Sequence, residues 1–348
     1  MARIIDNPWR RAEALPEGLV FAEGKVVASP ERVMALLARC PEYAPTPLVS
    51  HAGLAEALGL DALLVKDERG RMGLGSFKAL GAAFVVAQEA EAAGGRLEGR
   101  TFVTSSAGNH GLSLAAGARP FGARAVIYLS ENVPAGFAAR LREMGAEVVI
   151  EGQDYEASLE GAIRRARAEG WTLVSDSTWE GYAGGIAVME GYTALAAEIA
   201  GQTDPVDQIF LQAGVGGLAA AVTAHLRAAW GDGPEITIVE PEAAPALFGS
   251  IEAGAARRGP GPVSSMGRLD CKDPSLAALE TLARAADRFV LVSEDEGRAA
   301  AARLAEAGLA TSPSGGAGLA GLEAARAEGR LPEGARALIV LSEGPADD

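Results

Sequence analysis

Short apolar runs alternate with alanine-rich segments of helical periodicity from about residue 60 to the end of the chain. The predicted strands comprise residues 62–66, 101–104, 125–129, 147–150, 171–174, 208–211, 236–239, 289–292 and 337–341. The clearest predicted helices comprise residues 76–92, 135–144 and 185–200, and another begins at Asn109. Because the strands are apolar throughout, both faces of each should be buried, as in parallel sheets that helices cover on two sides. The alternation therefore predicts an α/β fold with two doubly wound open sheets.

The length and composition favour a globular protein of about two domains. The chain has 348 residues, 49% of them hydrophobic, which is more than one ordinary core contains. Its net charge of −15 argues against binding the phosphates of nucleic acids. Two distant cysteines fit a reducing compartment, and with three histidines we expect no metal site. Since we find no signal peptide and no apolar run of roughly 18 residues, we expect a cytoplasmic protein without a membrane span.

One lysine, Lys78, lies in an unusually apolar run formed by residues 73–81. An apolar setting disfavours the charged form of an amine, so we expect a lowered pKa for Lys78 and a nucleophilic amine. Such an amine forms a Schiff base with a carbonyl substrate or with pyridoxal phosphate. For a lysine considered alone, the ordinary interpretation is a packed stem with its charged head in water.

A glycine turn follows the predicted strand at 208–211 and leads into a helix. It consists of Gly214, Val215, Gly216, Gly217 and Leu218. Glycines let the backbone approach an anion, and a helix N-terminus presents free N–H groups to it, so this turn is a candidate phosphate site. A plain packing turn is one alternative. A dinucleotide site is another, because Gly214 to Ala219 match a loose fingerprint and Glu240 could contact a ribose; this would indicate an NAD-binding oxidoreductase.

A second polar turn lies between the strand at 101–104 and the helix that begins at Asn109. It consists of Ser105, Ser106, Ala107 and Gly108. Its serines and Asn109 could simply cap the helix. An asparagine that can donate to a phenolic oxygen nevertheless suits a pyridoxal ring better than a nucleotide. We expect a structural role, as a hydrogen-bonding residue, for the adjacent His110.

Three motifs occur in the order found in fold-type II pyridoxal phosphate enzymes, the relatives of tryptophan synthase β, threonine deaminase and cysteine synthase. The motifs are Ser76-Phe77-Lys78, the residues 107–111 and the residues 214–217. The chain resembles this superfamily from Thr46 to Ser342, and the residues 71–81, 176–182, 188–192 and 210–216 are similar to diaminopropionate ammonia-lyases. The resemblance implies a large cofactor-binding domain of residues 1–85 plus 182–348, a smaller α/β domain of residues 86–181, and a homodimer.

The resemblance also implies how the cofactor, pyridoxal 5'-phosphate, is bound. Lys78 would attach it covalently and later shuttle the Cα proton, and Phe77 would pack beside its ring. Asn109 would hydrogen-bond the phenolic oxygen, while backbone amides of residues 214–218 would bind the phosphate. Ser342, at the end of the last strand, would face the pyridine nitrogen, where a neutral hydroxyl favours elimination.

The implied reaction is a β-elimination from a small amino acid, with 2,3-diaminopropionate giving pyruvate and ammonia. The turn of residues 105–109 would bind the substrate carboxylate. Asp176 or Glu180 would bind the second ammonium of the substrate, and the resemblance favours Asp176, for which a turn-capping role is the alternative. Ser314 is a second candidate for the pyridine nitrogen, although its position favours a turn-forming role.

Two departures from the lyase branch concern the substrate. Ala107 stands where that branch usually has an aspartate, and residues 266–271 carry charge where the branch is mostly apolar. Arg268 and Asp270 could instead select an acidic or hydroxylated substrate. A threonine/serine or 3-hydroxy-amino-acid dehydratase, with hydroxide as the leaving group, is therefore an alternative that uses the same residues. A non-catalytic binding protein would have little reason to retain Lys78.

Overall fold

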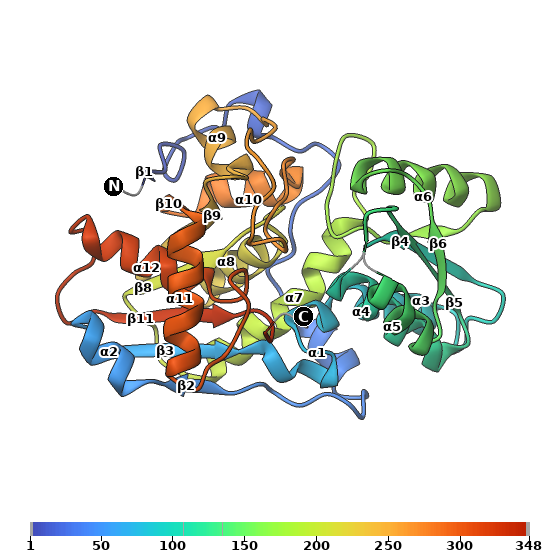
Figure 1. Ribbon diagram of the computed structural model, residues 1–348, viewed down its shortest axis with the longest axis horizontal. Helices are drawn as coiled ribbons and strands as arrows, with labels where there is room; N and C mark the ends of the chain where they lie inside the picture. Colours follow the sequence, from blue (N-terminus) through green and yellow to red (C-terminus); the bar gives the residue numbers. More distant parts are fainter. Residues whose placement is uncertain (1–2, 107, 134, 346–348) are drawn as a thin grey trace.

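The computed structural model describes residues 3–106, 108–133 and 135–345 and has two lobes, each built on its own sheet (Figure 1). Within these residues the larger sheet has the strand order β1 (Arg3–Asp6), β10 (Arg288–Val292), β9 (Glu235–Pro241), β8 (Gln208–Gln212), β11 (Arg336–Leu341), β3 (Ala62–Asp67) and β2 (Leu48–Ser50). The strands from β10 to β3 are parallel, and β1 and β2 join the two edges antiparallel. The predicted parallel sheet is confirmed.

Helices cover both faces of the larger sheet (Figure 1). One face packs against α7 (Gly185–Gln202), α8 (Gly217–Trp230), α9 (Ala246–Ala253) and α10 (Leu276–Ala285). The other face packs against α2 (Ala52–Leu58), α11 (Glu294–Glu306) and α12 (Ala317–Ala327). In β11, Leu338 and Val340 belong to the first core, while Ile339 and Leu341 belong to the second. Burial on both faces is the reason that these strands are apolar at every position.

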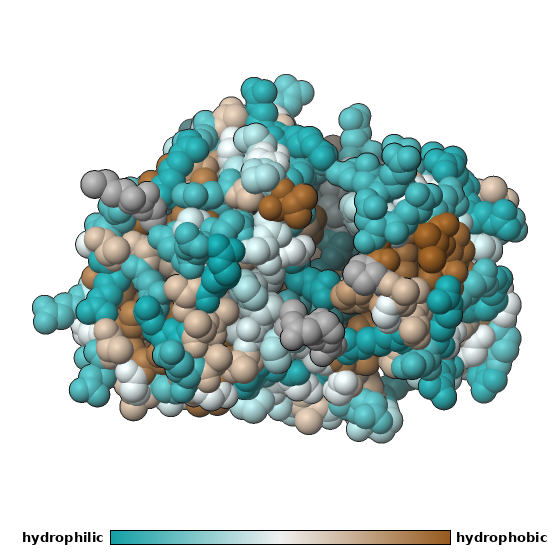
Figure 2. Space-filling view, in the orientation of Figure 1, coloured by the Kyte–Doolittle hydropathy of each residue, from teal (hydrophilic) through white to brown (hydrophobic). Residues whose placement is uncertain are grey.

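The smaller lobe repeats this arrangement on a smaller scale. Its described strands are parallel, in the order β6 (Glu147–Ile150), β5 (Arg124–Leu129), β4 (Thr101–Ser105) and β7 (Thr172–Leu173). One face packs against α3 (Ala82–Ala92), α4 (Asn109–Ala118) and α5 (Ala135–Glu143), and the other against α6 (Tyr155–Glu169). The α/β class with two doubly wound sheets is confirmed, whereas the domain boundaries after residues 85 and 181 stay a prediction. Figure 2 shows the surface hollowed between the lobes.

The helix expected at residues 76–92 is wrong in its first turns. Residues 77–80 form a short 3-10 helix, η3 (Phe77–Leu80), and the α-helix α3 begins only after Gly81. A Cβ on Gly81 would lie 2.7 Å from the Tyr192 ring on α7, so the chain approaches α7 more closely than a regular helix with side chains allows. The break leaves Lys78 in this short 3-10 helix and outside α3.

Candidate active site

Lys78 forms an ion pair across the two lobes. Its Nζ donates a hydrogen bond to Oδ2 of Asp176, which follows β7 of the smaller lobe. The side chains are 21% and 20% exposed, so the pair is partly accessible and not enclosed in the core. Because the pair joins the two lobes, we call the space around it the recess. The structure thus places together the two residues for which the sequence predicts catalytic roles.

The electrostatics of this pair correct one expectation. Burial alone would lower the pKa of Lys78, but the Asp176 carboxylate and Tyr192 outweigh it, so the pKa is raised rather than lowered. For Asp176, burial would raise the pKa, but the Lys78 ammonium holds it below its usual range. The apolar neighbours of Lys78 in the sequence correctly indicate that burial lowers its pKa. The carboxylate that raises this pKa, however, is 98 residues away in the chain.

Backbone contacts fix the turn that carries Lys78. The Phe77 N–H donates to the carbonyl of Ser342 at 3.0 Å, just beyond β11. The Phe77 ring packs edge-on against Tyr192, with centroids 4.8 Å apart, and the Lys78 Nζ lies 5.3 Å from the centre of the Phe77 ring. A side chain on Gly191 would collide with the carbonyl of Leu80, so α7 packs directly on this backbone. Phe77 thus lies next to both Lys78 and Tyr192, and its expected place beside the cofactor ring stays a prediction.

The glycine turn after β8, for which the sequence predicts a phosphate site, leads into the N-terminus of α8. Gly216 has φ = 99°, a left-handed conformation that favours glycine, and Gly217 begins α8. A Cβ on Gly214 would lie 2.9 Å from the Cys271 sulfur and 3.2 Å from the carbonyl of Arg268. The carbonyl of Val215 accepts from Ser275 at 3.0 Å, and Leu218 is buried in the first turn of α8. The first N–H groups of α8 have no acceptor within the helix, as at every helix N-terminus.

The second predicted turn brings the smaller lobe to the same recess. Ser105 donates to Ser158 at 3.1 Å, and Ser106 accepts from the N–H of Gly108 at 3.3 Å. Asn109 begins α4 and donates to Oε2 of Glu343 at 2.6 Å. The predicted substrate contact of Ala107 lies outside the described residues.

His110 is structural, as expected. It is buried, and its Nε2 lies 2.9 Å from the carbonyl of Val174, to which a neutral imidazole donates. Burial lowers the pKa of this imidazole, and the Lys78 ammonium acts in the same direction against an opposing effect of Asp176. A neutral, hydrogen-bonded ring at this position supports the loop after β7 that carries Asp176.

Ser342 and Glu343 end β11 at the recess. Ser342 is 5% exposed, and among the described residues its hydroxyl has no hydrogen-bond partner, so it is free to face a ring nitrogen. The Oγ of Ser314 instead accepts from the N–H of Arg268 at 3.1 Å, which supports its turn-forming interpretation. Glu343 also accepts from Ser312 at 2.5 Å and pairs with Arg268 at 3.6 Å.

Three further residues near this site, Glu343, Tyr192 and Cys271, are not among those that the sequence motifs predict to act there. Burial raises the pKa of Tyr192 and of the Cys271 thiol to about 12, so both are neutral near pH 7. A usable signal existed for Glu343, because it follows a parallel strand at the edge where sites form in α/β sheets. Tyr192 ends the segment 188–192 that resembles the lyase branch, but this resemblance gives it no role of its own, and Cys271 lies in an irregular segment.

Two other candidate residues, Glu240 and Glu180, lie outside the Lys78–Asp176 site. Glu240 is buried and accepts hydrogen bonds from the N–H groups of Leu247 and Phe248, at 2.8 and 2.6 Å, at the start of α9. Its carboxyl group caps this helix and cannot contact a ribose, so the dinucleotide interpretation is wrong. Glu180 is exposed at the tip of the loop after β7, and only Asp176 of that loop contacts Lys78.

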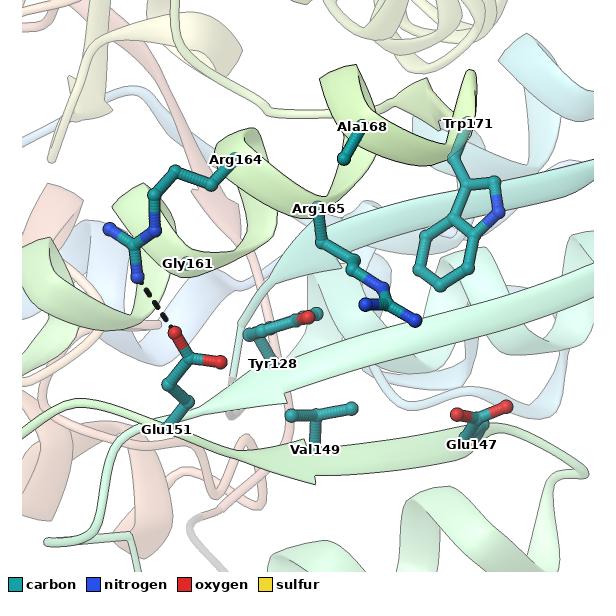
Figure 3. Close-up of a pocket in the computed structure, with 9 residues that line it drawn as sticks. All are labelled: Tyr128, Glu147, Val149, Glu151, Gly161, Arg164, Arg165, Ala168 and Trp171. Carbon is teal, nitrogen blue, oxygen red and sulfur yellow. Dashed lines mark hydrogen bonds and ion pairs between the residues drawn. The ribbon is translucent and has the colours of Figure 1, made fainter.

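A separate hollow of about 440 Å³ lies on the outer side of the smaller lobe (Figure 3). Figure 3 shows Arg164 and Arg165 of α6 projecting over β5 and β6, with Arg164 bonded to Glu151. The hollow shares no lining residue with the recess around Lys78. In the part of the chain that the structure describes, no cluster of three or more potential ligands could hold a metal, and no helix is long and apolar enough to cross a membrane.

The groups around the recess fit pyridoxal phosphate. A primary amine lies beside a carboxylate, and a glycine turn, in which Gly214 packs too closely against Cys271 to carry a Cβ, leads into a helix N-terminus. A free hydroxyl at Ser342 and an amide donor at Asn109 are available to a heteroaromatic ring. This donor set matches an aldehyde, a phosphate and a pyridine in one molecule.

Comparisons with known proteins agree with this chemistry. Residues 40–343 match the family model described as pyridoxal-phosphate dependent enzyme. Diaminopropionate ammonia-lyase of Escherichia coli is 30% identical over 71% of this chain and 68% of its own. L-threonine ammonia-lyase of Thermotoga maritima is 27% identical over 72% of this chain and 59% of its own. A crystal structure of the E. coli diaminopropionate enzyme in complex with an aminoacrylate–pyridoxal phosphate intermediate superimposes with a TM-score of 0.86 at 28% identity, covering 99% of this chain and 94% of that one. The chain belongs to the family of pyridoxal-phosphate dependent enzymes.

Proposed function

We propose that this enzyme is an ammonia-lyase that converts 2,3-diaminopropionate to pyruvate and ammonia by β-elimination. The observation that carries the proposal is the Lys78–Asp176 pair, which places a base and an anion side by side in the recess. Relatives named diaminopropionate ammonia-lyase, at 30% identity, support the choice of substrate.

Several residues of this chain would together bind the cofactor. Bound pyridoxal phosphate supplies an electron sink that makes the Cα proton of an amino acid removable. The backbone amides of residues 214–218 would bind its phosphate, Asn109 its phenolic oxygen and Ser342 its pyridine nitrogen, while Phe77 would flank the ring. These roles accord with the places of the residues around one recess.

Lys78 takes the Cα proton of the substrate, and Asp176 stabilises the ammonium that results because its carboxylate already lies on the Nζ. Asp176 also attracts the second ammonium of the substrate, which leaves from Cβ as ammonia. Ser105, Ser106 and Gly108 would bind the α-carboxylate.

A dehydratase that acts on threonine, serine or a 3-hydroxy-amino acid is the second candidate. Ala107 replaces the aspartate usual in the lyase branch, and the relative from T. maritima is named a threonine ammonia-lyase. Hydroxide would then be the leaving group, and the same amine would take the Cα proton.

Release of a keto acid from both enantiomers of diaminopropionate, serine, threonine and 3-hydroxyaspartate discriminates these functions. We expect the highest kcat/KM with a diaminopropionate enantiomer, and no pyruvate from either one would reject that substrate. Reduction with borohydride should also bleach the visible band and label Lys78, with Lys25→Ala as the control that retains both. Labelling elsewhere would reject the site itself.

The homodimer is a proposal that rests on the resemblance, and the cytoplasmic location is a proposal that rests on the two distant cysteines, which fit a reducing compartment. Light scattering of the purified enzyme should give a mass of two chains. A single-chain mass would contradict the dimer without affecting the proposed reaction.

A further inference from the structure

Arg268 reaches from the larger lobe to the turn expected to bind the substrate carboxylate. It lies in the irregular segment between α9 and α10, and its N–H is bonded to Ser314 at 3.1 Å. Its Nη1 would lie 2.8 Å from a Cβ on Gly108, so the guanidinium packs directly against the backbone there. Its Cζ is 5.6 Å from the centre of the Phe137 ring, on α5 of the smaller lobe.

Its neighbours hold the guanidinium of Arg268 in place, but several of its N–H donors make no hydrogen bond to the described residues. Nε of Arg268 pairs with Oε2 of Glu343 at 3.6 Å, which is too long for a hydrogen bond. The Glu343 carboxylate already accepts from Asn109 at 2.6 Å and from Ser312 at 2.5 Å. Among the described residues, no acceptor is bonded to the terminal amino groups of Arg268, and its side chain is 41% exposed. An oriented planar fork with unused N–H donors is suited to bind a carboxylate through two parallel hydrogen bonds.

The guanidinium faces the carboxylate turn and not the glycine turn after β8. The backbone carbonyl of Arg268 lies near Gly214 of the glycine turn, whereas its side chain extends to Gly108. A cationic group there would repel a substrate ammonium, and Asp176 would attract one. Opposite charges at Arg268 and Asp176 therefore define a direction for a substrate with a carboxylate at one end and an amine at the other.

We propose that Arg268 binds the α-carboxylate of the amino-acid substrate, together with Ser106 and Gly108. Glu343, Phe137 and Ser314 hold its side chain and backbone in place for this contact. The inference rests on the proposed function only in that the substrate is an α-amino acid, and it holds for diaminopropionate and hydroxy-amino acids alike.

Steady-state kinetics test the contact with the best substrate of the keto-acid panel. Arg268→Ala should raise KM by about 10- to 100-fold, the loss expected for a charge-assisted hydrogen-bonded pair, while kcat changes by less than about threefold. Arg268→Lys should recover part of this loss, because it keeps the charge but not the fork. An unchanged KM in Arg268→Ala would overturn the proposal, as would a fall in kcat alone.

Arg258→Ala is the matched control, because it tests whether the loss of a contact between the lobes is enough to raise KM. Arg258 lies in the same segment and also crosses to the smaller lobe, where it bonds Glu156 of α6 at 2.9 Å, and it pairs with Asp273. We expect its KM to stay within twofold of the unmodified enzyme. An equal rise in KM in both variants would mean that Arg268 only ties the lobes together, and this would overturn the proposal.

Labelling by phenylglyoxal gives a readout that needs no turnover. Mass spectrometry should find Arg268 modified in the enzyme, and propionate should slow this modification while propylamine, which has no carboxylate, should not. Arg258 serves as the internal standard. Failure of propionate to protect Arg268 would overturn the carboxylate contact, whereas failure of diaminopropionate turnover with intact protection would reject only the proposed substrate.

Discussion

At the scale of single residues, the chemistry of Lys78 depends on its opposing neighbours. Burial favours the neutral amine, and the Asp176 carboxylate favours the ammonium more strongly. Both carboxylate and ammonium are therefore charged when the pair is intact, with the pKa of Asp176 held low by the same contact. The amine becomes nucleophilic only when it loses this partner or exchanges its proton with a bound substrate.

Replacing Asp176 by Asn should therefore change both the activity and the acidity of Lys78. Without the carboxylate, burial dominates and the pKa of Lys78 should fall below its usual value of 10.5. In protein freed of cofactor, an amine reagent at pH 8 should modify Lys78 faster in Asp176→Asn than in the unmodified chain. The kcat should fall by about 10²- to 10⁴-fold, the usual contribution of a group that assists proton transfer.

The control for this change is Glu180→Gln, which removes an exposed carboxylate from the same loop. We expect its kcat to stay within twofold of the unmodified enzyme. Slower modification of Lys78 in Asp176→Asn would contradict the assigned direction of the pKa shift.

At the scale of elements, glycine determines where two segments can meet. Gly216 carries a left-handed φ of 99° at the start of α8, and its ideal Cβ would lie 3.2 Å from the side chains of Leu247 and Ala278. The conformation and the crowding both exclude a side chain at this position of the glycine turn. The shape of the turn thus depends on its own backbone conformation and on the helices behind it.

The variant Gly216→Ala should lower the free energy of unfolding by about 1–2 kcal/mol, because a non-glycine residue is strained in this conformation. It should also weaken pyridoxal phosphate binding, which the visible absorbance of dialysed enzyme measures. Gly249→Ala, in α9 with open space around its Cβ, is the control and should stabilise the protein by about 0.5–1 kcal/mol. Equal cofactor retention in both variants would count against the assignment of the phosphate site.

Glu240 is a buried carboxyl group that caps the start of α9. Burial raises the pKa of its carboxyl to about 8, and its hydrogen bonds from the N–H groups of Leu247 and Phe248 oppose this only in part. Since the folded pKa exceeds the unfolded value of 4.5, the folded state binds the extra proton. Stability is therefore greatest below pH 4.5 for this group and is lost as the pH rises towards 8.

Urea unfolding of Glu240→Gln tests this sign. Between about pH 5 and pH 8 the free energy of unfolding of the unmodified protein should fall relative to the variant by about 1.4 kcal/mol per pH unit, and it should level off above pH 8. A difference that does not depend on pH would show that Glu240 is ionised in the folded protein.

At the scale of the whole molecule, a buried ionic cluster joins the N-terminal segment to the larger sheet. Glu198 of α7 accepts from Lys66 of β3 at 2.6 Å and from Arg71 at 2.7 and 2.8 Å. Arg71 also bonds Glu68, and Tyr43 donates to Glu198 at 3.0 Å. Lys66 and Arg71 have fully buried side chains. The cluster is neutral in sum and fixes the backbone that leads to Lys78.

Glu198→Ala should lower the free energy of unfolding by about 3–5 kcal/mol, because it leaves two buried cations with one fewer anion. Denaturant unfolding of the protein without cofactor measures this. Glu147→Ala, which breaks the exposed pair with Arg124, should cost no more than about 1 kcal/mol. A similar small cost for Glu198→Ala would mean that water or a rearrangement compensates the cluster.

The sequence by itself determined the class of fold and the order of the site motifs. Apolar strands and glycine turns are local signals, because burial on both faces and a left-handed φ each leave their mark within a few residues. Thus Lys78, Asn109 and the turn of residues 214–218 were found without knowledge of their neighbours.

Only the tertiary structure decided which groups face one another. The partner of Lys78 is 98 residues away and that of Asn109 is 234 residues away, and no local pattern records such contacts. The raised pKa of Lys78, the capping role of Glu240 and the position of Arg268 over Gly108 all follow from such distant contacts. Electrostatic and packing energies depend on distance in space, whereas a sequence pattern reports distance along the chain.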